Sequence, residues 1–366
     1  MASRWKELTF RAAPAGEEER PLWPDVLKIV SIYAVILIHS AAPFLVRRAE
    51  LGPGAWWAGN LYDSASRWCI PLFFMLSGTF LLEKAGTMPL SAFLRGRVRR
   101  VLVPFVVWSL VYFLWRIRIQ GEELPLASFP LLLFTGPLYY HLWYLYVLIG
   151  LYLFAPALGA WLKGASGPQA GYFVGLWFLF ACLLPLGESW WGFEGYLSTG
   201  TAPSLFKYAG FFVLGHLLRR TVLRPTGMAQ FAGLFLLALA ATAWCTWYGT
   251  VVRNGGDLEE LFFEYFSPNV VAMALSVYLF GKSLRPPRRA LAARAVRAIA
   301  ACVPGIYLVH ALLIGVSKRG LLGFRVDPSD FAPAVGIPLF ALGVFAASFV
   351  VVYAVRSLPL VRRAFP

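Results

Sequence analysis

Ten apolar runs, each about long enough to cross a lipid bilayer, dominate this 366-residue chain. They lie near residues 25–45, 61–82, 101–119, 141–162, 169–186, 203–218, 228–249, 263–281, 302–317 and 332–355. A membrane-spanning helix needs about 17–25 predominantly apolar residues. A content of 59% hydrophobic and only 14% charged residues is also far from that of soluble domains. The sequence therefore predicts an all-α, polytopic membrane protein with about ten transmembrane helices.

The charged residues predict how the chain is oriented in the membrane. With a cytoplasmic N-terminus, the cytoplasmic segments hold about 22 Lys and Arg against 5 acids, and the outer segments about 8 against 11. We therefore expect both termini in the cytoplasm, with a mobile mixed-charge tail at 1–24, a transmembrane domain at 25–356 and a basic tail at 357–366. The net charge of +15 does not indicate a nucleic-acid partner, because the basic stretches lack interleaved aromatic residues.

His39 is the residue that points most directly to chemistry. It lies in the middle of the first apolar run, where a polar group is costly unless it is partnered or solvated. In a helix, the eleven positions from Lys28 to His39 amount to about 1100°, within about 20° of complete turns, and to a rise of roughly 16 Å. Both side chains then share one face. Asp25, one turn from Lys28, either neutralises that lysine or helps it to position a donor or tune His39.

Three further histidines can be structural or functional. His310 lies in the middle of the ninth run, with Tyr307 one turn away on the same face. His141 opens the fourth run two residues before Trp143, and His216 lies beside basic residues near an inner end. A hydrogen-bonded packing histidine is the alternative to a site residue at each position, and it is the preferred interpretation for His216.

A cationic cluster precedes the third run on the expected cytoplasmic side. It consists of Arg95, Arg97, Arg99 and Arg100. Such a cluster suits a ligand with several phosphates. The alternative is a helix that sets topology and binds lipid phosphates.

The outer side is expected to carry one apolar segment and two acidic loops. The segment from Pro125 to Pro137 is short and bounded by prolines, which favours a re-entrant or interfacial position. The loops span 187–202 and 251–262, and the first is also rich in Trp and Tyr. These residues suit carbohydrate binding, or they form an ordinary aromatic belt at the membrane interface.

Signatures of metal and nucleotide sites are absent. The four cysteines lie within or at the edges of the apolar runs and form neither a CxxC pair nor a zinc spacing with histidine. Gly281-Lys282-Ser283 resembles the end of a phosphate-binding loop, but Ser276 stands where that motif requires glycine. We therefore expect no metal and no permanently bound cofactor.

Five motifs, in order, resemble the acyltransferase-3 family. They are Asp25-Val-Leu-Lys28 with His39-Ser40, Ile70-Pro-Leu-Phe-Phe-Met-Leu-Ser77-Gly78, Arg97-Val-Arg-Arg100 before Pro104-Phe105, His141-Leu-Trp143, and Gly305-Ile-Tyr307-Leu-Val-His310. The resemblance covers about residues 22–355. Members of the acyltransferase-3 family are integral-membrane O-acyltransferases of surface polysaccharides and lipid-linked glycans.

The resemblance implies transfer of an acyl group, usually acetyl, from cytoplasmic acyl-CoA to a sugar hydroxyl of an envelope glycan at a bacterial plasma membrane. His39 matches the family's essential histidine, and Arg97 with Arg100 match its RxxR motif. Ser77, His141, Trp143, Tyr307 and His310 are then expected to line the acceptor pocket. Two positions depart from the family: Lys28 replaces a common arginine, and Leu148 stands where many members have glutamate. Lysine lacks the planar fork that pairs bidentately.

Two other functions remain open at this point. A transporter of a small polar solute or lipid-linked sugar would use the same intramembrane polar residues as a path. It would be expected to show internal repeats or paired broken helices, and the sequence shows neither. A sensor or assembly partner with a degenerate site is the third possibility, which the lysine at position 28 leaves open.

Overall fold

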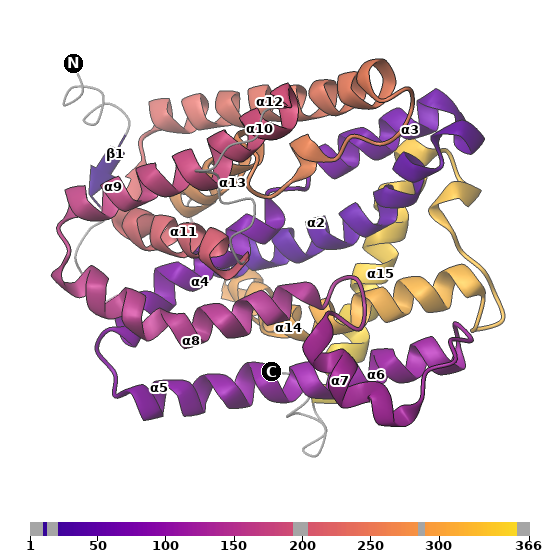
Figure 1. Cartoon of the computed structure of the whole chain (residues 1–366), viewed down its shortest axis with the longest axis horizontal. Helices are drawn as coiled ribbons and strands as arrows, with labels where there is room; N and C mark the ends of the chain where they lie inside the picture. Colours follow the sequence, from indigo (N-terminus) through magenta and orange to yellow (C-terminus); the bar gives the residue numbers. More distant parts are fainter. Residues whose placement is uncertain (1–9, 13–20, 193–203, 285–289, 357–366) are drawn as a thin grey trace. The chain divides into compact units, whose positions relative to one another are not determined.

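The computed structural model describes residues 10–12, 21–192, 204–284 and 290–356, and it is 83% helical (Figure 1). The chain divides into two compact units. The first comprises Met1–Leu81, Ala165–Ala300 and Val326–Gly343, and the second comprises Leu82–Gly164, Ala301–Arg325 and Val344–Pro366. Three helices, α4, α14 and α15, contribute residues to both units. Their bounds are Cys69–Ala85, Ala290–Arg319 and Pro333–Arg356.

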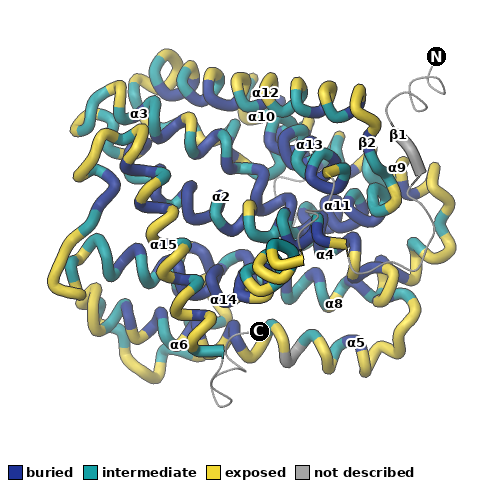
Figure 2. Tube along the Cα trace, turned by 180° about the vertical axis from the view of Figure 1, so that it is seen from behind, coloured by how far each residue is buried: buried dark blue, intermediate teal, exposed yellow. Residues whose placement is uncertain are grey.

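The first unit is built around α2 and the helices that follow it. Its helices are α2 (Trp23–Val46), α3 (Arg48–Ser64), most of α4, α9 (Gly167–Phe178), α10 (Leu184–Trp191), α11 (Ser204–Leu217), α12 (Pro225–Tyr248) and α13 (Pro268–Ser283). Short 3-10 helices lie at Leu218–Arg220, Leu261–Phe263 and Pro328–Asp330, and π-helical turns at Leu179–Leu183 and Gly249–Arg253. Helix α3 runs back along α2, and α13 packs along α12. Most of α2 is buried, whereas α12 exposes one side along its length (Figure 2).

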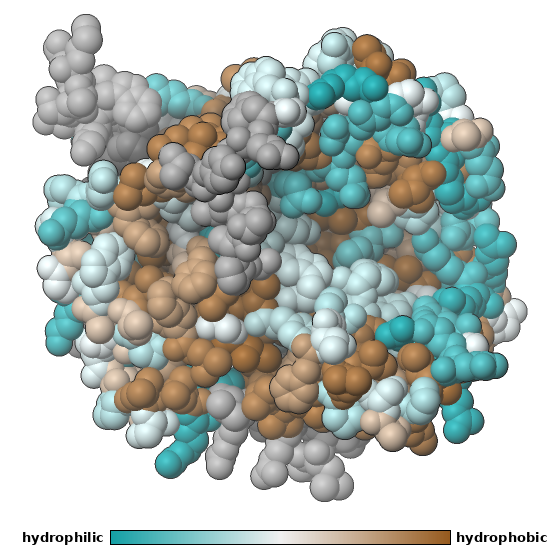
Figure 3. Space-filling model, viewed as in Figure 1, coloured by the Kyte–Doolittle hydropathy of each residue, from teal (hydrophilic) through white to brown (hydrophobic). Residues whose placement is uncertain are grey.

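The second unit contains a basic helix, a short apolar helix, two longer helices and parts of α4, α14 and α15. Its own elements are α5 (Leu90–Arg97), a π-helical turn (Val98–Leu102), α6 (Val103–Arg118), a 3-10 turn (Leu126–Ser128), α7 (Phe129–Thr135) and α8 (Trp143–Gly164). Helix α8 exposes apolar side chains such as Leu153 and Trp161, and hydrophobic residues gather over it in Figure 3. An exposed apolar helix face is what a lipid environment requires.

Local sequence signals explain where the helices begin. Proline stands in the first turn of α2, α6, α12 and α13, where its missing N–H is not needed and its fixed φ suits the helix. Helix α9 begins with a capping box, in which Ser166 and Gln169 satisfy each other's backbone N–H groups. Helix α3 bends at Gly52, whose φ of 82° favours glycine.

Each of the ten predicted spans corresponds to helix, but eight meet the length and hydropathy expected of a membrane span among the described residues. The other two predicted spans are α11 and α13, which are only 14 and 16 residues long. Helices of that length rise roughly 21–24 Å, less than the roughly 30 Å hydrocarbon core. The protein is therefore an all-α, multi-pass membrane protein, in which these two helices are shorter than the sequence indicated.

Small residues allow α4 and α11 to approach closely. A Cβ placed on Gly78 would lie 2.0 Å from the Phe212 carbonyl oxygen, and one placed on Gly215 would lie 2.0 Å from that of Met75. Thr79 adds hydrogen bonds to the Gly215 carbonyl, at 3.1 Å, and to the Tyr278 hydroxyl, at 2.9 Å. Membrane helices associate through such close packing and polar contacts. Gly78, next to the predicted pocket residue Ser77, therefore lets α4 pack closely against α11.

Part of the N-terminal tail forms a short strand. Strand β1 (Phe10–Ala12) pairs antiparallel with β2 (Thr221–Leu223), which lies between α11 and α12, and Arg11 is opposite Val222. The tail at 1–24 was expected to be mobile, and pairing over these three residues restrains it locally. Residues 1–9, 13–20 and the basic tail at 357–366 lie outside the described part of the chain.

Candidate active site

Asp25 and Lys28 form an ion pair in the first turns of α2. The Lys28 ammonium donates to the Asp25 carboxylate across 3.2 Å, with 3% of the Asp25 side chain and 31% of the Lys28 side chain exposed. Asp25 also lies in the first helical turn, where the helix dipole stabilises a negative charge. The aspartate is thus enclosed, while the lysine keeps access to solvent or ligand.

His39 lies eleven residues further along the same uninterrupted helix. Helix α2 keeps helical geometry from Trp23 to Val46, so the rotation calculated from the sequence applies to Lys28 and His39. His39 is half-buried, whereas Ile38 and Ser40 on either side of it are buried. Ser40 donates to the Ile36 carbonyl at 2.8 Å, as hydroxyl groups in membrane helices commonly do.

A second constellation lies within the other unit. The ring of His141, just before α8, lies 5.1 Å from that of His310 and 5.4 Å from that of Tyr307, both on α14, measured between centroids. The Tyr307 hydroxyl donates to the His141 carbonyl oxygen. His310 is completely buried, and His141 is 2% exposed. Three of the predicted acceptor-pocket residues are therefore brought together.

The hydrogen bond of His310 defines its tautomer. Its Nδ1 lies 2.7 Å from the Tyr307 carbonyl oxygen. A carbonyl only accepts, so Nδ1 carries the proton, and Nε2 is then the ring atom that can take one. The backbone thus fixes both the orientation and the protonation pattern of this ring.

Several tyrosines that the sequence analysis did not single out surround His141. The Tyr112 ring lies 4.8 Å from the His141 ring and stacks on that of Tyr139 at 4.5 Å. The Tyr112 hydroxyl donates to the Leu308 carbonyl at 2.7 Å and accepts from the Leu312 N–H at 3.2 Å. It thereby bridges groups four residues apart on α14. Tyrosine is a common interfacial residue, and no spacing between residues 112 and 310 could have indicated this contact.

The remaining predicted pocket residues are Trp143 and Ser77. Trp143 begins α8, is half-buried and contacts the Tyr144 ring edge to face, with 6.3 Å between centroids. Ser77 is half-buried on α4 within the first unit. Leu148, at the position where the family often has glutamate, is buried on α8.

The basic cluster spans the junction of α5 and α6. Arg97 is half-buried, and its guanidinium lies 5.6 Å from the Phe93 ring and 5.7 Å from the Tyr152 ring. Arg95 and Arg100 are exposed, and the side chain of Arg99 lies outside the described residues. Cation–π contacts hold Arg97 in place, so the fold fixes its position better than those of the exposed Arg95 and Arg100.

The predicted outer segments differ in how much of them is described. Pro125 to Pro137 contains the short helix α7, which exposes Leu131 and Phe134. In the loop at 251–262, Arg253 donates to the Trp190 carbonyl at 3.1 Å and lies over its ring at 4.1 Å. Most of the loop at 187–202 lies outside the described residues. Across the described ranges, no three His, Cys, Asp or Glu side chains are grouped to hold a metal ion.

The chain belongs to the acyltransferase-3 family. The family model, described as an acyltransferase domain, matches residues 22–356, nearly the whole chain. No curated protein and no solved structure matches this chain. The resemblance found in the sequence motifs is therefore confirmed, and the protein is a membrane acyltransferase by family.

Proposed function

We propose that the protein is an O-acyltransferase of a bacterial plasma membrane. It moves an acyl group, acetyl in the simplest case, from cytoplasmic acyl-CoA to a hydroxyl of an envelope glycan or lipid-linked sugar. Family membership supports the reaction class. The single observation that supports the chemistry is a half-buried histidine in the interior of a continuous helix, directly after a largely apolar stretch at residues 29–38.

His39 is the proposed general base. A sugar hydroxyl is a weak nucleophile near neutral pH, and a neutral imidazole can take its proton as the oxygen attacks the thioester carbonyl. The new C–O bond forms, the C–S bond breaks, and the imidazolium returns the proton to the departing thiolate of coenzyme A. In the alternative sequence of steps, His39 attacks the thioester first, the C–S bond breaks and coenzyme A leaves as the thiol. The sugar hydroxyl then attacks the acyl-histidine, takes the acyl group and restores the imidazole.

Basic residues are proposed to hold the donor. Arg97 and Arg100, flanked by Arg95, would contact its phosphates through charge-assisted hydrogen bonds. Lys28, paired with Asp25 but partly exposed, adds a positive charge on the helix that carries His39. The donor is a substrate, so none of these contacts needs a permanently bound cofactor.

The proposal is tested by following a labelled acetyl group from the donor to the acceptor. Purified protein in lipid nanodiscs is incubated with acetyl-labelled acetyl-CoA and a glycan fraction of the envelope. We expect label in the glycan, released by mild alkali as an ester is, and no transfer with His39→Ala. Label that stays on the donor, or that resists alkali as an amide does, would contradict O-acyl transfer from acetyl-CoA.

A further inference from the structure

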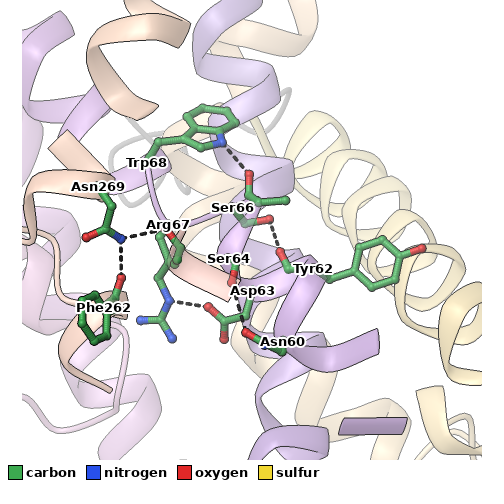
Figure 4. A network of polar contacts seen from close by, with 11 residues as sticks. Asn60, Tyr62, Asp63, Ser64, Ser66, Arg67, Trp68, Phe262 and Asn269 are labelled. Carbon is green, nitrogen blue, oxygen red and sulfur yellow. Dashed lines mark hydrogen bonds and ion pairs between the residues drawn. The ribbon is translucent and has the colours of Figure 1, made fainter. Parts of the chain in front are cut away.

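A buried ion pair lies at the break between α3 and α4 in the first unit (Figure 4). The Arg67 Nε donates to the Asp63 Oδ1 across one helical turn. The Asp63 side chain is completely buried, and 16% of the Arg67 side chain is exposed. The aspartate is therefore enclosed by the protein, whereas part of the arginine side chain is accessible from outside the protein.

Hydrogen bonds and ring contacts surround this pair. Asn60 donates to the Ala243 carbonyl of α12 at 2.9 Å and accepts from the Ser64 hydroxyl at 3.1 Å, as Figure 4 shows in part. The Phe263 ring, which is 1% exposed, lies 4.4 Å from the Arg67 guanidinium. Asn269 fixes the neighbouring backbone by donating to the Phe262 carbonyl at 2.8 Å. The site is thus built before any ligand arrives.

Hydrogen-bonding capacity remains on both members of the pair. The Asp63 Oδ2 is buried and accepts no hydrogen bond from the described residues. The two terminal nitrogens of Arg67 make no hydrogen bond within the described part of the chain either. A buried carboxylate oxygen without a donor is costly, so this atom points to a ligand that donates.

The pair lies at the depth of His39 along the α2–α3 hairpin. A Cβ on Gly59 would touch the Phe44 Cβ at 2.8 Å and the Ala41 carbonyl at 3.3 Å, which sets the register of these antiparallel helices. Asp63 is one turn further along α3. At 1.5 Å per residue it is therefore level with about residues 38 and 39 of α2.

We infer that Asp63 and Arg67 form a subsite for a hydroxyl group of an uncharged sugar in the acceptor. A hydroxyl both donates and accepts, so one group can donate to the Asp63 Oδ2 and accept from Arg67. An anionic group fits less well, because Asp63 already balances the guanidinium and Glu260 and Glu264 lie near enough to act on the pair electrostatically. This inference rests on the proposed function and adds residues that recognise the acceptor.

The test measures binding separately from transfer. The probes are octyl β-D-glucoside, a neutral sugar on an alkyl chain, and octyl phosphate as its anionic counterpart, each titrated into protein in nanodiscs. We expect wild type to prefer the glucoside. Asp63→Asn and Arg67→Lys should each weaken glucoside binding at least about tenfold, because each loses a charge-assisted hydrogen bond, and acetyl-CoA affinity should not change.

Two further variants distinguish a role in sugar binding from a purely structural role. Glu50→Gln removes the exposed Arg47–Glu50 pair on the same helix and should change neither affinity. If a single variant fails to fold, Asp63→Asn with Arg67→Gln removes both charges together and should show the same loss. Unchanged glucoside affinity in a folded variant would show that the pair has only a structural role. Preference of the wild type for octyl phosphate would show that the pair binds anions. Either result would overturn the inference.

Failure of the subsite and failure of the proposed function give different results. Glucoside binding that depends on Asp63 and Arg67, without any acetyl transfer by wild type, would retain the subsite and reject the transferase assignment. Transfer to the glycan with a KM that both variants leave unchanged would retain the transferase and reject the subsite.

Discussion

The two units each place a histidine inside a membrane helix, and the two sites differ in access. His310 is completely buried, its Nδ1 bonds to a backbone carbonyl, and aromatic rings surround its neighbour His141. His39 is half-buried on the helix that also presents the partly exposed Lys28. A general base must come within hydrogen-bond reach of its substrate. The comparison therefore favours the proposed role of His39 in proton transfer and is consistent with a positioning role for the enclosed cluster.

His39→Ala should have the largest effect on activity. Loss of a general base lowers the rate about 10²-fold or more, and removal of a half-buried side chain should leave the fold intact. Initial rates of acetyl transfer, normalised to correctly folded protein, give the comparison. A rate within about threefold of wild type would remove His39 from the mechanism.

Substitution of Lys28 is expected to have the second-largest effect on activity. Lys28→Met takes the positive partner from an enclosed aspartate, and we expect at least about a tenfold loss of activity, because breaking an enclosed pair is strongly unfavourable. Lys28→Arg should be close to neutral if only the charge matters. A faster Lys28→Arg variant would show instead that a bidentate contact is needed, and equal rates for wild type and Lys28→Met would contradict both accounts.

Tyr112 tests the enclosed cluster through stability. Tyr112→Phe leaves the Leu308 carbonyl without this donor and should lower the free energy of unfolding by about 1–3 kcal/mol. The KM for acyl-CoA should not change, because the tyrosine acts on α14 and not on the donor. Urea titration and steady-state kinetics on the same preparation give both values. A large rise in the donor KM at unchanged stability would place this cluster in the donor site.

Substitutions in the basic cluster should have the smallest effect on activity, and the effect should differ between Arg97 and Arg95. Arg97→Ala should raise the KM for acyl-CoA several-fold, and added salt should reproduce part of that rise. Arg95→Ala is the matched control, because exposed charges contribute little individually. Equal effects of the two variants would indicate a general electrostatic contribution instead of a fixed contact at Arg97.

The fold was largely predictable, because apolar length is a strong signal. Long apolar runs placed the helices of both units. What the sequence could not indicate was the 17-residue helix α3, which carries Glu50 and Asp63 and lacks the hydropathy of a span. It is helical because it packs against α2, and packing partners are not visible in a single sequence.

The candidate site was predictable only where residues share a helix. The spacing of Asp25, Lys28 and His39 on α2 could be calculated from helix geometry alone. The contact between Tyr112 and α14 joins residues almost 200 positions apart, so it comes from tertiary packing and not from local pattern. Asp63 and Arg67 are only four positions apart, but their burial also depends on tertiary packing, which no local motif indicates.

Chemical rescue tests the central comparison most directly. His39→Ala and His310→Ala are each assayed for acetyl transfer with and without added imidazole at a pH where imidazole is mostly neutral. If the half-buried His39 is the base, imidazole should restore part of the activity of His39→Ala in proportion to its concentration and none of that of His310→Ala. Rescue of His310→Ala alone would contradict the assignment and place the base in the enclosed cluster.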